Sequence, residues 1–152
     1  MFNRVVVPLD GSPLAEQALT QAVELANRLD IPVTLVRVVD VTMLDRYGAY
    51  GLAAEYTAVG QLAAEEQEAA DEYLAATMQR LATEAKQPVT VRVMTGAAAK
   101  AIVEAAGPED VIVMASHGRT GVKRWFLGSV AEDVMRKAAS PVLLIRADEP
   151  TA

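Results

Sequence analysis

The stretch Arg4–Leu19, RVVVPLDGSPLAEQAL, changes from strand-like to helix-like character within a few residues. Its first part, Arg4–Leu9, is a short β-branched run without polar alternation, which is typical of a strand covered on both faces. An Asp-Gly pair then breaks the run, Ser12 is a favourable N-cap, and Pro13 suits the first position of a helix. Apolar residues recur at helical spacing over Leu14–Leu29. The stretch therefore predicts a buried strand followed directly by a helix.

The rest of the chain repeats this alternation. The pattern predicts further strands and helices in the order Val33–Val39 (strand), Gln61–Lys86 (helix), Val89–Met94 (edge strand), Gly96–Ala106 (helix), Asp110–Met114 (strand), Gly128–Ala139 (helix) and Val142–Arg146 (strand). Strands separated by helices indicate a parallel sheet with helices on both faces. We expect an α/β fold with an open, Rossmann-like, five-stranded parallel sheet of strand order 3-2-1-4-5.

The segment Asp40–Gly60 lacks a regular pattern, and it holds three of the nine glycines and three of the four tyrosines. We interpret it either as a mobile loop or as a lid. We expect a single domain over residues 1–147 and a flexible tail over residues 148–152.

Composition excludes several classes of function. The net charge of −6 argues against general binding of nucleic acid or of an anionic membrane surface. The chain has no cysteine, which excludes disulfides and thiolate metal sites, and a single histidine, His117, which excludes a multi-histidine site. The first residues do not have the pattern of a signal peptide, and no apolar stretch approaches the roughly 20 residues of a membrane span. A cytoplasmic protein is expected.

Ligands of such folds bind beyond the carboxyl ends of the strands, so the loops after Leu9, after Val39 and from Ala115 onward should meet at one site. The last of these is the most informative. It contains three basic residues, Arg119, Lys123 and Arg124, and leads to Gly128-Ser129 at the start of a helix.

A helix N-terminus presents free N–H groups and partial positive charge, so it binds anions. Gly128 would let backbone approach a phosphate closely, and Ser129 could cap the helix or donate to a phosphate oxygen. The alternative is a simple cap beside a solvated basic surface. The segment is not a P-loop, because GxxxxGK[ST] is absent, and the chain has no GxGxxG motif.

The order Ala115-Ser116-His117-Gly118, nine residues, then Gly128-Ser129 resembles the GxxG–nine residues–G[ST] nucleotide-binding signature of the universal stress protein family. The opening VVVPLDGSPLAEQAL resembles that family's first strand and its Asp-Gly-Ser turn, VRVVD its second strand, and SPVLLIR its last. The resemblance therefore covers nearly the whole chain.

The resemblance implies a site for ATP or AMP. Pro8 and Asp10 would lie against adenine and ribose, the backbone of Val38 would read the adenine edge, and Gly118 would lie beside the phosphates. The complete set of residues expected at the nucleotide is Pro8, Leu9, Asp10, Val38, Ala115, Ser116, His117, Gly118, Arg119, Gly128, Ser129 and Val130. Asp10 is also a candidate contact for Mg²⁺ or Mn²⁺ accompanying the phosphates, the alternative being a turn or ribose aspartate.

Ala115 departs from the signature, which has glycine at this position. If the backbone there has negative φ, alanine costs little and only tightens the pocket. If it needs positive φ, alanine costs on the order of 1 kcal/mol.

The function that the resemblance implies is that of an adenine-nucleotide-binding sensor or regulator of the cytoplasmic stress response. It also implies a homodimer formed by pairing of Val142–Arg146 with its copy. Two alternatives stay open: a nucleotide-free interaction module whose pocket Ala115 has closed, and a slow nucleotide hydrolase on the same fold. The sequence does not indicate a nucleophile, a base and an electrophile that would act together in catalysis. We interpret His117 as a loop residue near the ligand.

Overall fold

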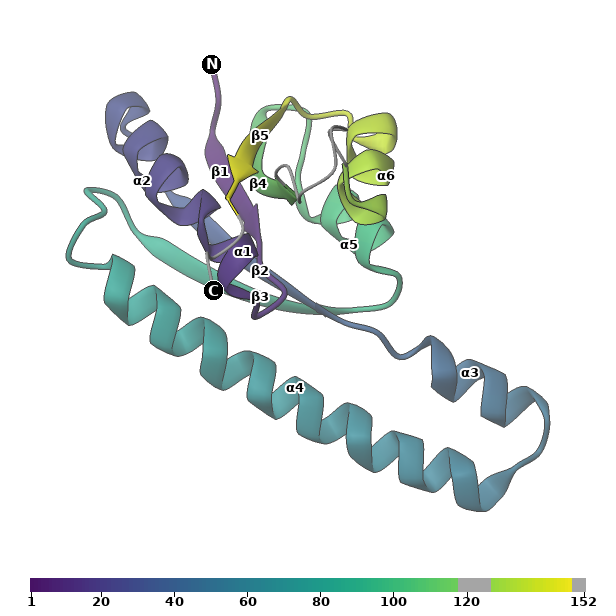
Figure 1. Ribbon diagram of the computed structural model, residues 1–152. Coiled ribbons are helices and arrows are strands. Elements are labelled where there is room, and N and C mark those ends of the chain that lie inside the picture. The colour runs from purple at the N-terminus through teal and green to yellow at the C-terminus, as the bar shows by residue number, and fades with distance from the viewer. Residues whose placement is uncertain (118–126, 149–152) are drawn as a thin grey trace.

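The computed structural model describes residues 1–117 and 127–148, and only the backbone of Met43, Leu44, Tyr47 and His117. Within these residues the chain forms five strands and six helices (Figure 1). In chain order they are β1 (Arg4–Pro8), α1 (Pro13–Glu16), α2 (Ala18–Leu29), β2 (Val33–Val39), α3 (Thr42–Ala49), α4 (Ala53–Leu81), β3 (Val89–Thr95), α5 (Ala98–Ala105), β4 (Asp110–His117), α6 (Ser129–Lys137) and β5 (Val142–Ala147).

The strands form one sheet of order β3-β2-β1-β4-β5, in which every neighbouring pair is parallel. This confirms the predicted fold and strand order. From β1 the chain adds β2 and β3 on one side, and then crosses to add β4 and β5 on the other. The order therefore reverses between β1 and β4, and their carboxyl ends mark the place where such folds bind ligands. The strands β3 and β5 lie at the two edges, and the edge position predicted for Val89–Met94 is confirmed.

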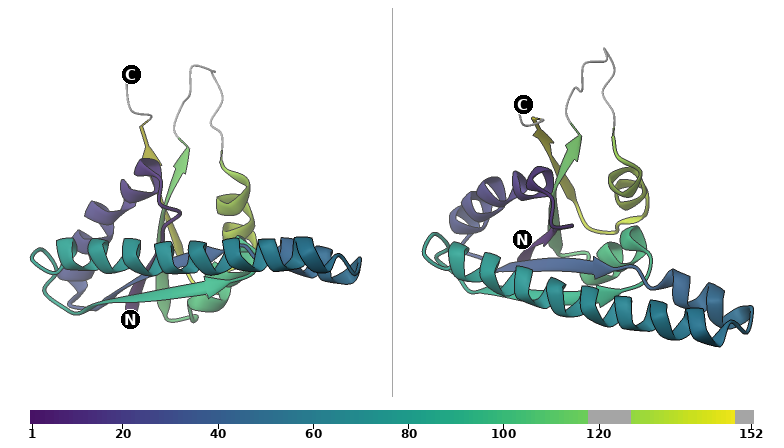
Figure 2. Two further views of the ribbon diagram at one scale, coloured as in Figure 1. Left: turned by 90° about the horizontal axis from the view of Figure 1, so that it is seen from below. Right: turned by 60° about the horizontal axis from the view of Figure 1, so that its bottom comes forward.

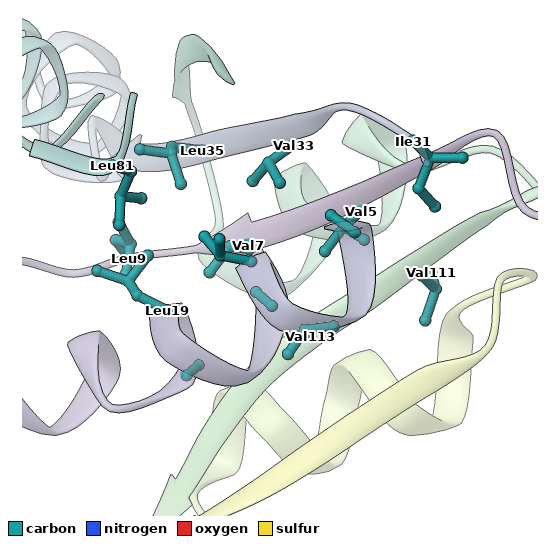
Figure 3. Packing of buried hydrophobic residues seen from close by; sticks show 14 of the residues in the cluster. Val5, Val7, Leu9, Leu19, Ile31, Val33, Leu35, Leu81, Val111 and Val113 are labelled. Carbon is teal, nitrogen blue, oxygen red and sulfur yellow. The ribbon is translucent and has the colours of Figure 1, made fainter. Parts of the chain in front are cut away.

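Helices cover both faces of the sheet (Figures 1 and 2). On one face, side chains of α2 and α4 pack against Val5 and Val7 of β1, and Figure 3 shows this cluster with Leu19, Leu35 and Val113. On the other face, α5 and α6 pack against Val6 and its neighbours. Because alternate residues of a strand point to opposite faces, the consecutive valines of β1 serve both clusters. The prediction of a strand covered on both faces is confirmed.

The turn after β1 begins a helix as predicted. Ser12 is the N-cap of α1, its hydroxyl oxygen accepts a hydrogen bond of 3.1 Å from the N–H of Ala15, and Pro13 takes the first helical position. The single helix expected over Leu14–Leu29 is instead divided at Gln17. Its N–H donates to the carbonyl of Leu14 over 3.2 Å, the tighter spacing of a 3₁₀ turn.

The segment Asp40–Gly60, interpreted as a mobile loop or a lid, is not an irregular loop. This segment forms α3 and the first turns of α4, which lie side by side and project beyond the sheet in both views of Figure 2. Asp40 supports the start of α3, because its Oδ1 accepts a hydrogen bond of 2.9 Å from the N–H of Thr42, and hydrogen bonding to Thr42 lowers the pKa of Asp40. Only the later turns of α4 meet the sheet, through buried residues that include Leu74 and Leu81.

An ion pair joins β1 to β4 at the amino ends of the strands, opposite the carboxyl-end loops. Nη2 of Arg4 lies 2.6 Å from Oδ2 of Asp110 and also donates to the carbonyl of Ala105, and the N–H of Gly107 donates to the same carboxylate oxygen over 2.8 Å. Burial alone would raise the pKa of Asp110. The hydrogen bonds from Arg4 and Gly107, together with the charge of Arg4, bring that pKa below its usual value.

Replacing this carboxylate should cost stability in a pH-dependent way. We expect Asp110→Asn to lower the free energy of unfolding by about 2 kcal/mol near neutral pH, because it leaves a partly buried arginine without its counter-charge. The folded-state pKa of Asp110 is depressed, so its contribution is present above the unfolded pKa of about 4 and is lost as the pH falls through the folded value. Urea unfolding of both proteins measures this. A wild-type–variant difference that stayed constant into strong acid would contradict the assignment.

The strand β4 continues through His117, three residues beyond the predicted end at Met114, so Ala115 lies in a strand and not in a loop. It pairs with Ile145 of β5, and it packs against the cluster that contains Val7. Among the described non-glycine residues, positive φ occurs at Asp30 alone. Ala115 therefore has a backbone that any residue adopts, and the cost of alanine in a positive-φ position does not arise.

Restoring the glycine of the family signature should consequently destabilise the protein. We expect Ala115→Gly to lower the free energy of unfolding by about 1 kcal/mol, because glycine loses more backbone entropy in a strand and removes a packed methyl group. Thermal or urea unfolding of the two proteins tests this. A variant more stable than the wild type would show that alanine is strained at this position.

Candidate functional site

A pocket of about 230 Å³ opens at the carboxyl ends of β1, β2 and β4, where the strand order reverses. Residues from the turn after β1, from α1 and α5, and from the start of α6 complete its wall. Its lining consists of Pro8, Leu9, Asp10, Leu14, Ala15, Val36, Arg37, Val38, Ala98, Ile102, Met114, Ala115, Ser116, Gly128, Ser129, Val130 and Ala131.

The pocket brings together nine of the twelve residues that the sequence predicts at a ligand. These are Pro8, Leu9, Asp10, Val38, Ala115, Ser116, Gly128, Ser129 and Val130. His117 is the last residue of β4, and its side chain is outside the description. Gly118 and Arg119, and the other basic residues of that segment, lie outside the described residues, as do residues 149–152 of the predicted tail.

Asp10 lies in the turn between β1 and α1. Its Oδ1 accepts hydrogen bonds from both the N–H of Ser12, at 2.9 Å, and the hydroxyl of Ser12, at 2.5 Å. The described residues offer no hydrogen bond to its other oxygen, Oδ2, and the residue is exposed. The turn thus fixes the carboxylate at the pocket and leaves one oxygen able to accept a hydrogen bond from a ligand.

The start of α6 forms the opposite wall. Gly128 is the N-cap, and no side chain caps this end of the helix. The N–H groups of Ser129, Val130 and Ala131 have no partner inside the helix, because the first turn of any α-helix leaves them free. Ser129 is thus the first helical residue and not the cap, and its hydroxyl and these N–H groups present donors and partial positive charge at the pocket.

Ser116 adds a buried polar group to this wall. The residue is only 2% exposed, and its hydroxyl oxygen has no hydrogen-bond partner among the described residues. An unpaired buried hydroxyl costs free energy comparable to a lost hydrogen bond, so such a group at a pocket wall points to a ligand that supplies the partner.

The remaining wall is apolar. Val36, Ile102 and Met114 belong to the core cluster on the α5 and α6 face, and they also line the pocket. Sequence reasoning missed them, together with Leu14, Ala15, Arg37, Ala98 and Ala131. Val36 could have been found by pairing the predicted strands side by side. The N–H of Leu9 donates to the carbonyl of Val36 over 2.8 Å, so the carboxyl ends of β1 and β2 lie next to each other. Arg37 was detectable as the one charge in the apolar run VTLVRVV.

The part of the chain that the structure describes contains neither a cluster of metal-binding side chains nor a membrane-spanning helix. No three His, Cys, Asp or Glu side chains gather closely enough to hold a metal ion among these residues. None of the described helices combines the length and apolar character that crossing a membrane requires. What the pocket offers chemically is an apolar wall, called here the apolar slot, with a hydrogen-bond acceptor on one side and a helix N-terminus suited to anions on the other.

Comparison with known proteins gives a consistent result. The model of the universal stress protein family matches residues 1–146. A universal stress protein of Methanocaldococcus jannaschii is 34% identical over 151 residues, which is 96% of this chain and 83% of the relative. The structure of the universal stress protein UspA from Lactobacillus plantarum superposes with a TM-score of 0.76 at 25% identity, covering 95% of this chain and 98% of that one.

Two more distant structures share the fold and were solved with nucleotides. A universal stress protein in complex with cAMP has a TM-score of 0.67 at 20% identity, covering 97% of this chain and 98% of that one. The universal stress protein from Archaeoglobus fulgidus in complex with dAMP has a TM-score of 0.65 at 23% identity, covering 96% and 98%. The match of the family model over nearly the whole chain, together with the shared fold, shows that this chain belongs to the universal stress protein family.

Proposed function

We propose that the pocket binds an adenine nucleotide, ATP or AMP, and that the protein acts as a nucleotide-dependent sensor or regulator. In this arrangement the base would enter the apolar slot beside Val38 and Met114. The ribose would lie at Asp10, and the phosphates would lie at the start of α6. The cAMP and dAMP bound by two structural relatives are adenine nucleotides, which supports this choice of base.

The observation that carries the proposal is the buried hydroxyl of Ser116 beside the uncapped start of α6. Both groups are hydrogen-bond donors without a partner among residues 1–117 and 127–148, and both line the same pocket. A phosphate chain supplies several acceptor oxygens and negative charge, and so satisfies the hydroxyl and the free N–H groups together. An uncharged apolar ligand would leave these donors unpaired.

Asp10 fits the ribose, because its free Oδ2 accepts hydrogen bonds and ribose hydroxyls donate them. A Mg²⁺ or Mn²⁺ ion would come with the nucleotide, held mainly by phosphate oxygens with at most this one carboxylate. A role in a cytoplasmic stress response is the expectation that follows from membership of the family.

Neutralising Asp10 should weaken nucleotide binding without unfolding the turn. We expect Asp10→Asn to reduce the affinity for AMP about tenfold, because the amide oxygen still accepts from Ser12 but the charged acceptor for the ribose is gone. Isothermal titration calorimetry measures the affinity. Asp71→Asn, at an exposed position of α4 away from the pocket, is the matched control and should bind as the wild type does.

Experiments on the wild-type protein distinguish nucleotide binding from the two alternatives, a nucleotide-free interaction module and a nucleotide hydrolase. If the pocket binds adenine nucleotides, denatured wild-type protein should release them, or millimolar ATP or AMP should raise its melting temperature. Neither release nor stabilisation would contradict the proposal and favour a nucleotide-free interaction module. Sustained phosphate release from ATP that Ser129→Ala abolishes would instead indicate a hydrolase.

We further propose that the protein forms a two-fold dimer through β5. This strand lies at an edge of the sheet, and its second residue, Leu143, is 41% exposed. An exposed apolar edge strand is a template for pairing with another strand, and two identical strands meeting across a two-fold axis bury the same residues on both sides.

Introducing a charge at this edge should separate the subunits. We expect a wild-type dimer in light scattering coupled to size-exclusion chromatography, and a monomer for Leu143→Asp, because dimerisation would bury an unpaired carboxylate. Val91→Asp is the matched control, since Val91 is 38% exposed on β3 at the opposite edge, and it should leave the dimer intact. A monomeric wild type, or a dimer lost equally in both variants, would contradict pairing through β5.

A further inference from the structure

Arg37 is a charged residue near the carboxyl end of an otherwise apolar strand. Its neighbours Val36 and Val38 pack into the cluster beneath α5 and α6, while Leu35 packs on the opposite face. Arg37 therefore projects on the face of Leu35, and it lines the pocket from the β2 side. Nothing in the proposed function gives it a role.

The guanidinium lies beside the turn that follows β1. A Cβ atom placed on Gly11 would be 3.9 Å from both Cζ and Nη2 of Arg37. Gly11 has a φ of 84°, a conformation in which glycine is favoured, and it directly follows Asp10. The guanidinium therefore lies within van der Waals reach of this turn, next to the residue that carries the Asp10 carboxylate.

No described side chain or carbonyl pairs with this cation. Residues 1–117 and 127–148 contain five ion pairs within 4.0 Å, and Arg37 is in none of them, nor does it donate a hydrogen bond within this part of the chain. Asp10 is the only carboxylate that lines the pocket within the described ranges, and its Oδ1 accepts hydrogen bonds from Ser12. Half-buried charged groups normally have a partner, and the described residues supply none, so this arginine is available to the anion of a ligand.

We propose that Arg37 is a specificity-determining residue of the pocket, and that it selects adenine nucleotides with a second phosphoryl group on the 2′ or 3′ oxygen of the ribose. This inference rests on the proposed function, which places the ribose at Asp10. The sheet order sets the direction: β1 lies between β2 and β4, so Arg37 and the start of α6 approach Asp10 from opposite sides. With the 5′-phosphates at α6 on the far side of Asp10, the group of the nucleotide that we expect to face Arg37 is on the hydroxyl edge of the ribose.

Asp10 does not oppose such a ligand. Two hydrogen bonds from Ser12 hold Oδ1 away from the ligand, and a singly substituted ribose keeps one hydroxyl that donates to Oδ2. The planar guanidinium can donate two parallel N–H hydrogen bonds to two oxygens of one phosphoryl group. A ribose hydroxyl has a single oxygen and cannot accept this pair of hydrogen bonds.

The test compares AMP with adenosine 3′,5′-bisphosphate and adenosine 2′,5′-bisphosphate by calorimetric titration. We expect the wild type to bind at least one bisphosphate about tenfold more tightly than AMP. Arg37→Gln should remove this preference while leaving the affinity for AMP within about twofold, and Arg37→Lys should retain part of it. Arg92→Gln is the control, since Arg92 is exposed on β3 opposite Val36 and does not line the pocket.

The outcomes separate the two proposals. The assignment of Arg37 is overturned if the wild type binds AMP as tightly as both bisphosphates, or if Arg37→Gln still prefers a bisphosphate. Either result leaves the proposed adenine-nucleotide site unchanged. A wild type that binds none of the three nucleotides overturns both. A melting temperature of Arg37→Gln equal to that of the wild type shows that a lost preference does not come from unfolding.

Discussion

The structure depends on one constraint: β1 lies in the middle of a parallel sheet and is covered on both faces. Val5 and Val7 pack under α2 and α4, and Val6 packs under α5 and α6, each without measurable exposure. A strand in this position must have neighbours on both sides, and here these are β2 and β4. Because all of these strands are parallel, the loops that follow them emerge at the same edge of the sheet. The pocket is a consequence of this packing.

The amino ends of the strands contribute to stability, whereas the carboxyl ends form the pocket. At the amino ends, Arg4 and Asp110 form an ion pair that two further hydrogen bonds support, so this end stabilises the register of β1 against β4. At the carboxyl ends, four polar groups have no partner within the described part of the chain: Oδ2 of Asp10, the hydroxyl of Ser116, the first N–H groups of α6 and the guanidinium of Arg37. Unpaired polar groups that cluster in one pocket are what a charged ligand requires, and they explain why stability and binding can be altered separately.

Much of the fold could be predicted because local signals agreed with each other. The valine run, the Ser12 cap and Pro13 all indicated the same boundary, and the alternation of strands and helices fixed a parallel sheet. The segment Asp40–Gly60 could not be predicted, because the first turns of α4 are mostly exposed and have no buried face to impose an apolar period. The end of β4 was missed for a related reason. Ala115 and Ser116 are small and polar enough to look like a loop, and only pairing with Ile145 and Arg146 extends the strand.

For the site, motif spacing found the residues near Asp10 and Gly128, and it could not find those contributed by neighbouring strands. Val36, Met114 and Arg37 reach the pocket through sheet register and through the turn at Gly11, which are properties of the folded chain. The same holds for Ala115, where the sequence left two possibilities for the backbone. Its place in β4 decides between them, so the departure from the family signature leaves the backbone of the pocket unstrained.

The central claim is that the carboxyl end of the sheet, between the Asp10 turn and the start of α6, is the nucleotide site. The most direct test is a titration of ¹⁵N-labelled protein with AMP, followed by amide chemical shifts. The account predicts saturable shifts concentrated at Asp10–Ser12, at Ser116 and at Ser129–Ala131, with little change at Arg4, Gly107 and Asp110 at the other end of the sheet. Saturable shifts centred on the α3–α4 projection or on the amino ends of the strands, or no shifts at millimolar AMP, would contradict it.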